Sequence, residues 1–240
     1  MLLTAKGISK RFGANPVLQD ASFSVRDQEI LGLIGPNGAG KTTLFECLAG
    51  LLPVNAGAVR HVGAGTGTGE RKRVLYYVPD GIHPWPDQTL GWATHFYERL
   101  FARSRAEAER VLHSLGLVHL AESPLGWLSK GESKRAMIAL GLLTPQPILM
   151  LDEPFDGLDL RQMRDVMALF KEVSRAGRTL MLSVHELAHA AQICDRLVLL
   201  SAGRVAGEGT LDELRARAGL AAGGIAGGIE EVFLALTAAS

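Results

Sequence analysis

The feature that most constrains the fold of this 240-residue chain is a glycine-rich segment after a short apolar run. Residues 35–43 read Gly-Pro-Asn-Gly-Ala-Gly-Lys-Thr-Thr and match the pattern Gly-x-x-x-x-Gly-Lys-Thr. The run Ile30–Ile34 before it is typical of a buried strand, and Thr43–Ala49 after it has a helical pattern. A strand, this turn and a helix in that order predict a phosphate-binding loop in an α/β fold.

The residue types in this loop suit a nucleoside triphosphate. Glycines let backbone N–H groups turn toward phosphate oxygens, and the N-terminus of the following helix carries a partial positive charge. Lys41 can reach the β- and γ-phosphates, and the Thr42 hydroxyl can ligate Mg²⁺. The alternative is a glycine-rich turn before an ordinary helix. The expected nucleotide-binding residues are Gly35, Pro36, Asn37, Gly38, Ala39, Gly40, Lys41, Thr42 and Thr43.

Two adjacent acids, Asp152 and Glu153, follow a second apolar run, Ile148–Leu151. Carboxylates at the carboxyl end of a parallel strand face the ligand crevice of such a fold. Asp152 can hold Mg²⁺, directly or through water, and Glu153 can orient or deprotonate an attacking water. Acids after strands are often helix caps, but together with the glycine-rich loop they predict a complete site for nucleotide hydrolysis.

Short apolar runs alternate with helical patterns along the chain, which predicts an α/β fold with a mostly parallel sheet flanked by helices. The expected buried strands are Ile30–Ile34, Ile148–Leu151, Leu180–Val184 and Arg196–Leu200, with a tight turn at 201–204 into a return strand. Less buried strands are expected at Leu2–Ile8 and Phe23–Val25. Capping residues and apolar spacing predict helices between Ser104 and Gly116, over Leu160–Ala176 and between Thr210 and Gly219.

Two segments are rich in glycine. Four alternate glycines over 63–69 precede the basic triplet 71–73, and no helical pattern follows them, so we expect a hairpin tip with a solvated basic face. Residues 219–228 are typical of a linker. The linker leads to a helical apolar stripe that we expect to dock on the core, formed by Ile229, Val232, Phe233 and Leu236.

Composition excludes several classes of function. Lys and Arg together number 25, as do Asp and Glu, so the formal charge of zero argues against nucleic acid as a partner. Cys47 and Cys194 have no paired spacing, which argues against a disulfide framework or a thiolate zinc site and favours a reducing compartment. No window reaches about 18 uninterrupted apolar residues, so no membrane span is expected.

Three more motifs, in order along the chain, resemble those of the ATP-binding cassette (ABC) ATPases. Residues 128–132, Leu-Ser-Lys-Gly-Glu, resemble the family signature Leu-Ser-Gly-Gly-Gln and precede the Asp152 strand. Residues 156–159, Asp-Gly-Leu-Asp, resemble the family's D-loop, and His185 follows the next strand, as in the family. The resemblance covers essentially residues 2–209.

The resemblance implies a P-loop NTPase core with an N-terminal antiparallel β-subdomain and an α-helical insert. It further implies one ABC ATPase domain over 1–240, with core and β-subdomain in 1–80 and 144–209, the insert in 81–143, and C-terminal helices in 210–240. ATP and Mg²⁺ are the implied ligands. Phe12 is expected to stack on adenine, and the expected metal ligands are Thr42, Asp80 and Asp152.

The implied mechanism uses two copies of the chain. Glu153 is the expected catalytic carboxylate, and His185 is expected to contact the γ-phosphate. The signature of a second, identical copy would contact the same nucleotide, so that two ATP molecules hold a head-to-tail dimer until hydrolysis releases it. The residues expected to bind nucleotide from that side are Ser129, Gly131, Glu132 and Asp159.

This chain departs from the family pattern at three positions. Asp80 stands where the family usually has Gln, and it could still reach Mg²⁺ although it donates no hydrogen bond. Lys130 replaces a signature Gly and adds a cation near the expected γ-phosphate, and Glu132 replaces Gln. Because Lys41, Ser129, Gly131 and Glu153 are kept, we still expect hydrolysis. We expect the coupling between the nucleotide and the partner to be altered.

The expected function is to power a separate membrane permease from the cytoplasmic face of the inner or plasma membrane. Aromatic residues over 81–101, Trp85 among them, are either core residues or the permease contact. Ile229–Thr237 resembles the terminal segment of drug, antibiotic and natural-product exporter ATPases, which favours export. Two alternatives stay open: a soluble ABC ATPase that acts on a macromolecule, and a low-turnover nucleotide-binding regulatory subunit.

Overall fold

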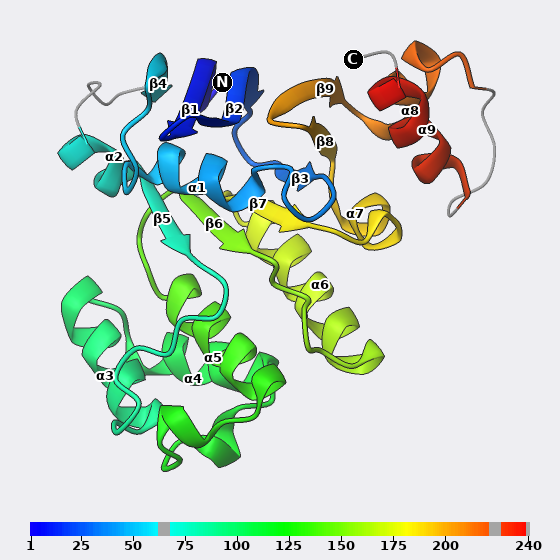
Figure 1. Ribbon diagram of the computed structural model, residues 1–240. Helices are drawn as coiled ribbons and strands as arrows, with labels where there is room; N and C mark the ends of the chain where they lie inside the picture. The colour runs from blue at the N-terminus through cyan, green and yellow to red at the C-terminus, as the bar shows by residue number, and fades with distance from the viewer. Residues whose placement is uncertain (62–67, 221–226, 239–240) are drawn as a thin grey trace.

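The computed structural model describes residues 1–61, 68–220 and 227–238, and its strands form two sheets (Figure 1). The larger sheet has six strands in the order β5-β6-β7-β3-β8-β9. These are β5 (Leu75–Val78), β6 (Ile148–Asp152), β7 (Thr179–Val184), β3 (Ile30–Ile34), β8 (Arg196–Ser201) and β9 (Arg204–Gly209). The smaller sheet, in the order β2-β1-β4, is antiparallel and contains β1 (Leu3–Phe12), β2 (Asn15–Val25) and β4 (Ala56–His61).

Five strands of the larger sheet, from β5 to β8 in the spatial order, run parallel, and the sixth, β9, returns antiparallel to β8. Every residue of β3, β6 and β7 is buried, because helices or the smaller sheet cover both faces, and this explains their continuous apolar sequences. The turn between β8 and β9 places Ala202 and Gly203 at positive φ, as a tight hairpin requires. The expected P-loop NTPase fold with an N-terminal antiparallel β-subdomain is therefore confirmed.

The helices are α1 (Lys41–Ala49), α2 (Thr68–Val74), α3 (Leu90–Phe101), α4 (Arg105–Ser114), α5 (Lys130–Leu142), α6 (Leu160–Arg175), α7 (Leu187–Ile193), α8 (Leu211–Arg217) and α9 (Gly227–Ala238). Short 3₁₀ turns occur at Val118–Leu120 and Leu125–Trp127. In Figure 1, α3, α4 and α5 gather in one group, away from the smaller sheet. Ser104 and Thr210 cap α4 and α8 through their hydroxyl groups, as their spacing predicts.

Apolar side chains pack on both faces of the larger sheet. On one face, alternate strand residues join α1 and the smaller sheet around the fully buried Phe45. On the other face, the remaining strand residues join α5–α9 around the fully buried Phe170. Val232, Phe233 and Leu236 of α9 pack against this second cluster, so the expected docking of the terminal helix is borne out for these three residues. The sheet is therefore the middle layer of the molecule.

The expectation for the first glycine-rich segment is wrong in one respect. Residues 68–74 form α2, where the pattern predicted no helix, and the basic triplet lies in its last turn, where it complements the helix dipole. Arg71 also donates to the carbonyl of Cys47 at 3.1 Å. Gly63, Gly65 and Gly67, and most of the expected linker 219–228, lie outside the described residues.

The C-terminal end of α5 is held by two arginines that are distant from it in sequence. Arg103 donates to the carbonyl groups of Leu143 and Thr144, at 3.0 and 3.1 Å. Arg178 donates to those of Leu142 and Gly141, at 2.9 and 3.2 Å. Burial and the nearby Arg103 cation lower the pKa of Arg178 to about 10, so it stays protonated at neutral pH. These guanidinium groups add donors for carbonyls at and just beyond the end of α5, where no further helical turn supplies N–H groups.

Candidate active site at the strand ends

The glycine-rich loop connects β3 to α1 and encloses the Lys41 side chain, which is only 5% exposed. Its Nζ donates to the carbonyl oxygens of Gly35 and Pro36, at 2.8 and 3.3 Å. A Cβ on Gly35 would lie 2.3 Å from the carbonyl oxygen of Leu200, so only glycine fits there. The other loop residues follow in the same turn: Asn37 and Gly38 are exposed, Ala39 is buried, Gly40 is at the helix start, and Thr42 and Thr43 are in the first turn of α1.

The start of α1 fits a phosphate group. Gly40 precedes the helix at φ 101° and provides no capping side chain, and the first turn contains no acidic residue. By contrast, α5, α6 and α8 each begin with a capping box that uses their first N–H groups. The N-terminal N–H groups of α1 therefore have no capping side chain that competes with an anion, and the helix dipole favours negative charge there.

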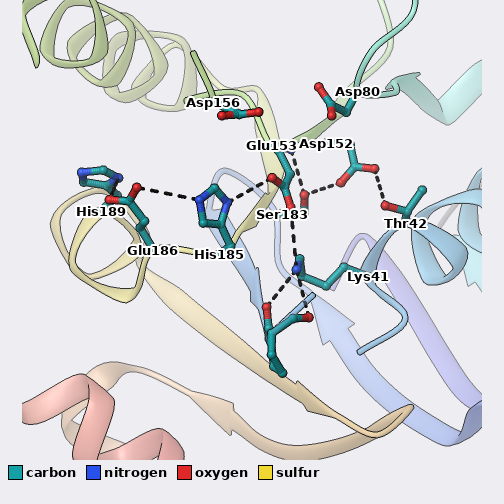
Figure 2. A network of polar contacts seen from close by, with 12 residues as sticks. Lys41, Thr42, Asp80, Asp152, Glu153, Asp156, Ser183, His185, Glu186 and His189 are labelled. Carbon is teal, nitrogen blue, oxygen red and sulfur yellow. Dashed lines mark hydrogen bonds and ion pairs between the residues drawn. The ribbon is translucent and has the colours of Figure 1, made fainter. Parts of the chain in front are cut away.

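Three hydroxyl groups converge on the Asp152 carboxylate, which is 3% exposed. Oδ2 accepts from Thr42 Oγ1 at 2.8 Å, and Oδ1 accepts from Ser183 Oγ (Figure 2). Oδ2 also accepts from the Tyr77 hydroxyl at 3.2 Å. Burial and the nearby Asp152 charge raise the pKa of Tyr77 above its usual range, so Tyr77 remains a donor. The sequence motifs did not reveal Tyr77 or Ser183, because strand pairing alone brings them to Asp152.

Glu153 lies at the centre of the polar network in Figure 2. Its backbone has a φ of 48°, in the left-handed region that side chains other than glycine rarely adopt. Its N–H donates to Ser183 Oγ at 2.9 Å. The carboxylate lies 3.0 Å from His185 Nδ1 and 3.7 Å from Lys41 Nζ. The structure thus brings together the two residues expected to be catalytic, beside the loop lysine.

Asp80 follows β5, and its carboxylate forms an ion pair with Lys134 of α5. No sequence motif contains Lys134, whose side chain is 11% exposed. Among the described residues, Asp80 forms no hydrogen bond or ion pair with Asp152 or with the three hydroxyl groups that bind it. The expected role of Asp80 as a metal ligand therefore stays a prediction, and the carboxylate already has a cationic partner.

The signature residues form the start of α5. Ser129 caps this helix, and Glu132 completes the capping box by accepting from the Ser129 N–H at 2.8 Å. These hydrogen bonds to Ser129 lower the pKa of Glu132. A Cβ on Gly131 would lie 2.8 Å from the Gly157 carbonyl oxygen, so the signature and the D-loop are in close contact. Asp159 likewise caps α6, in a box with Gln162.

Phe12 ends β1 with its ring 49% exposed. The Lys10 ammonium lies 5.2 Å from the ring centroid. The exposed ring is accessible to a ligand, and the lysine adds positive charge beside it. Its role in stacking on adenine stays a prediction.

The described residues contain no group of three or more His, Cys, Asp or Glu side chains arranged for a metal ion. The Thr42 hydroxyl and the Asp152 carboxylate are oxygen donors, which suit Mg²⁺, and they lie beside the loop expected to hold phosphates. Mg²⁺ usually takes few protein ligands and completes its shell with water and phosphate oxygens. The residues present therefore fit a magnesium–nucleotide complex better than a metal bound by protein alone.

Comparison with known proteins decides the family. Residues 18–156 match the model of the ABC transporter family. This chain belongs to that family. It is 35% identical to the cobalt import ATP-binding protein CbiO of Rhodobacter capsulatus, over 93% of this chain and 84% of that protein. It is 32% identical to the doxorubicin resistance ATP-binding protein DrrA of Mycobacterium tuberculosis, over 91% of this chain and 69% of that protein.

A solved structure of the ATP-binding subunit of an ABC transporter superposes with a TM-score of 0.88 at 32% identity, and the match covers 99% of this chain and 100% of that one. The family comprises the ATP-hydrolysing subunits of transporters, so the chain is an ABC ATPase that binds nucleotide. In the part of the chain that the structure describes, no helix is long and apolar enough to cross a bilayer.

Proposed function

We propose that this chain powers a separate membrane permease, that the transporter is an exporter, and that two copies bind and release each other as ATP binds and is hydrolysed. The observation that carries the proposal is the cluster of Lys41, Thr42, Asp152, Glu153 and His185 at one edge of the sheet. Its position at the ends of parallel strands is where ligands bind in this class of fold.

In this proposal the loop and α1 hold the triphosphate, with Lys41 as the cation for the β- and γ-phosphates. Thr42 and Asp152 hold Mg²⁺, which would neutralise phosphate charge. The Glu153 carboxylate orients a water and accepts its proton. His185 Nδ1, 3.0 Å from Glu153 Oε2, positions that carboxylate, which also lies 3.7 Å from Lys41 Nζ, and contacts the terminal phosphate.

The second copy contributes its signature to the same nucleotide. Ser129 is exposed and caps a helix of 13 residues. Its capping box uses the N–H groups of Ser129 and Glu132, which leaves those of Lys130 and Gly131, with the Ser129 hydroxyl proton, for a phosphate from outside this chain. Gly131, Glu132 and Asp159 belong to the same surface, since the signature contacts the D-loop. This arrangement supports a head-to-tail pair of identical chains.

An exposed cluster of aromatic and apolar side chains on the helical insert supports the permease contact. We call it the aromatic patch, and it consists of Trp85, Trp92, Phe96 and Leu100. The rings of Trp92 and Phe96 stack 5.5 Å apart, and Trp85 meets both edge-on. Large apolar side chains grouped on a surface mark contacts with a protein or membrane partner. A permease at this site would hold the chain peripherally on the cytoplasmic side of the membrane.

The direction of transport rests on the C-terminal segment. Residues 229–237 lie in α9 and resemble the ends of exporter ATPases, and the drug-resistance relative agrees with this. The relative named for cobalt import gives the opposite indication.

The test is to tag the full chain, co-express it with its neighbouring genes, extract membranes in detergent and identify what co-purifies. A polytopic membrane protein in stoichiometric amount is expected. A monomeric ATPase without a membrane partner would contradict the permease, and import driven by the reconstituted complex would contradict the direction.

A further inference from the structure

Two lysines on one face of α5 reach the carboxyl ends of β5 and β6, where the proposed hydrolytic residues lie. Lys130 and Lys134 are four residues apart, so their side chains project from the same side of the helix. Lys130 Nζ lies 2.8 Å from Asp156 Oδ2, and Lys134 Nζ pairs with Asp80. Each lysine therefore forms an ion pair with a carboxylate that follows a strand of the larger sheet.

The two acids flank the proposed hydrolytic residues. Asp80 follows β5 and Asp156 follows the neighbouring strand β6, on either side of Asp152 and Glu153 (Figure 2). Four carboxylates at two adjacent strand ends would repel the phosphates of a nucleotide. The ion pairs with Lys134 and Lys130 neutralise two of these charges, those of Asp80 and Asp156.

The two pairs are not equally screened by solvent. The Lys134 side chain is 11% exposed and that of Asp80 43%, whereas the Lys130 side chain is 66% exposed and that of Asp156 35%. Because screening by water and salt is weaker for the less exposed pair, Lys134 affects the field at the site more than Lys130 does.

The pairs also span a gap. A cavity of about 380 Å³ separates the N-terminal half of α5 from the strand ends, and its lining includes both lysines, Asp80 and Asp152. Near the other end of the helix, Gly141 packs so closely that a Cβ there would lie 2.9 Å from Val78 Cγ2. The start of α5, which carries the signature, contacts the D-loop closely at Gly131, and ion pairs join it to the ends of β5 and β6 across the cavity.

We propose that Lys134 is a positioning residue that acts on the nucleotide site through Asp80: it neutralises this carboxylate, so that nucleotide affinity depends on the charge of Lys134. Lys130 acts on Asp156 in the same way, with a smaller effect. The inference rests on the proposed function, and it assigns Asp80 to Lys134 instead of to Mg²⁺.

The test is equilibrium binding of a fluorescent ATP analogue with MgCl₂ to the full chain, which reports affinity without turnover. Lys134→Met is expected to weaken binding about fivefold, and Asp80→Asn in that background to restore it to within about twofold of the original chain. Lys134→Arg keeps the charge and is expected to bind as the original does. Arg105→Met removes the same charge from the exposed pair with Glu109 on α4 and is the matched control, with no expected change.

Asp80→Asn alone leaves the lysine in place and covers the case in which Lys134→Met fails to fold. It is expected to bind the analogue at least as tightly as the original chain. Weaker magnesium-dependent binding in this variant would show that Asp80 is a metal ligand and overturn the inference. Unchanged binding in a folded Lys134→Met variant, or no rescue by Asp80→Asn, would also overturn it. Failure of the original chain to bind the analogue would instead refute the proposed function.

Discussion

The backbone of Glu153 adopts a left-handed conformation whose energetic cost is offset by the contacts around it. We expect Glu153→Gln to keep this geometry, because the amide is nearly the same size, while losing the group that accepts a proton. Turnover should fall about 10²- to 10⁴-fold with nucleotide affinity unchanged. Steady-state phosphate release and analogue binding measure the two effects. Residual activity equal to that of the original chain would exclude Glu153 as the catalytic carboxylate.

Glu132 makes the start of α5 sensitive to pH. Its pKa lies below the ordinary value of 4.5 because it accepts hydrogen bonds from Ser129. The stability that the charged carboxylate contributes is therefore complete above pH 4.5 and is lost as pH falls through the lowered pKa. We expect Glu132→Gln to melt at a lower temperature than the original chain at pH 7 and to approach it under acid conditions. Thermal denaturation across pH checks this, and a difference that does not change with pH would contradict it.

For single residues, the sequence predicted those that belong to one short motif. It missed those that only tertiary packing brings to the site. Lys41, Asp152 and Glu153 follow from local patterns, since a loop or strand end fixes where they lie. Tyr77 and Lys134 do not, because each reaches its acid only after β5 and α5 have packed against the core. No local periodicity carries that information.

Among the elements, α3 gives the most direct test of the partner surface. Its exposed face carries three members of the aromatic patch, spaced four residues apart: Trp92, Phe96 and Leu100. We expect Trp92→Ser with Phe96→Ser to abolish co-purification with the permease while the melting temperature stays nearly the same, because both rings are already about 40% exposed. Leu51→Ser, an exposed apolar residue outside the insert, is the control. Retained co-purification would place the permease elsewhere.

The sequence did not predict β4 and α2, because neither has a long local pattern. β4 contains Gly57, which sits at φ 89° against the backbone of Gly7, and it pairs with β1, which is distant in sequence. Likewise, α2 is short and starts in a glycine-rich stretch, so its helical pattern is too brief to read. The long buried strands and the capped helices were predictable because their patterns are local and strong.

At the scale of the whole molecule, the proposal requires two chains. We expect the Glu153→Gln chain to elute as a dimer with ATP and Mg²⁺ and as a monomer without them, because a nucleotide that is not hydrolysed keeps bridging the two copies. Adding Ser129→Arg to the same chain should leave a monomer, since the large side chain occupies the place of the phosphate contact. Light scattering after gel filtration measures both. A dimer that forms equally well without nucleotide would contradict the mechanism.

The anchored end of α5 gives the signature helix a mechanical property. Arg103 and Arg178 hold the carbonyl groups at its C-terminus, whereas its N-terminal half faces a cavity crossed by ion pairs and contacts the D-loop at Gly131. The helix can therefore tilt about its C-terminal end, which the two arginines hold. A helix of 13 residues is about 20 Å long, so a tilt of about 10° at that end would carry Ser129 roughly 3 Å, the length of one hydrogen bond. A rotation too small to disturb the core would thus suffice to engage or release a phosphate held by the other copy.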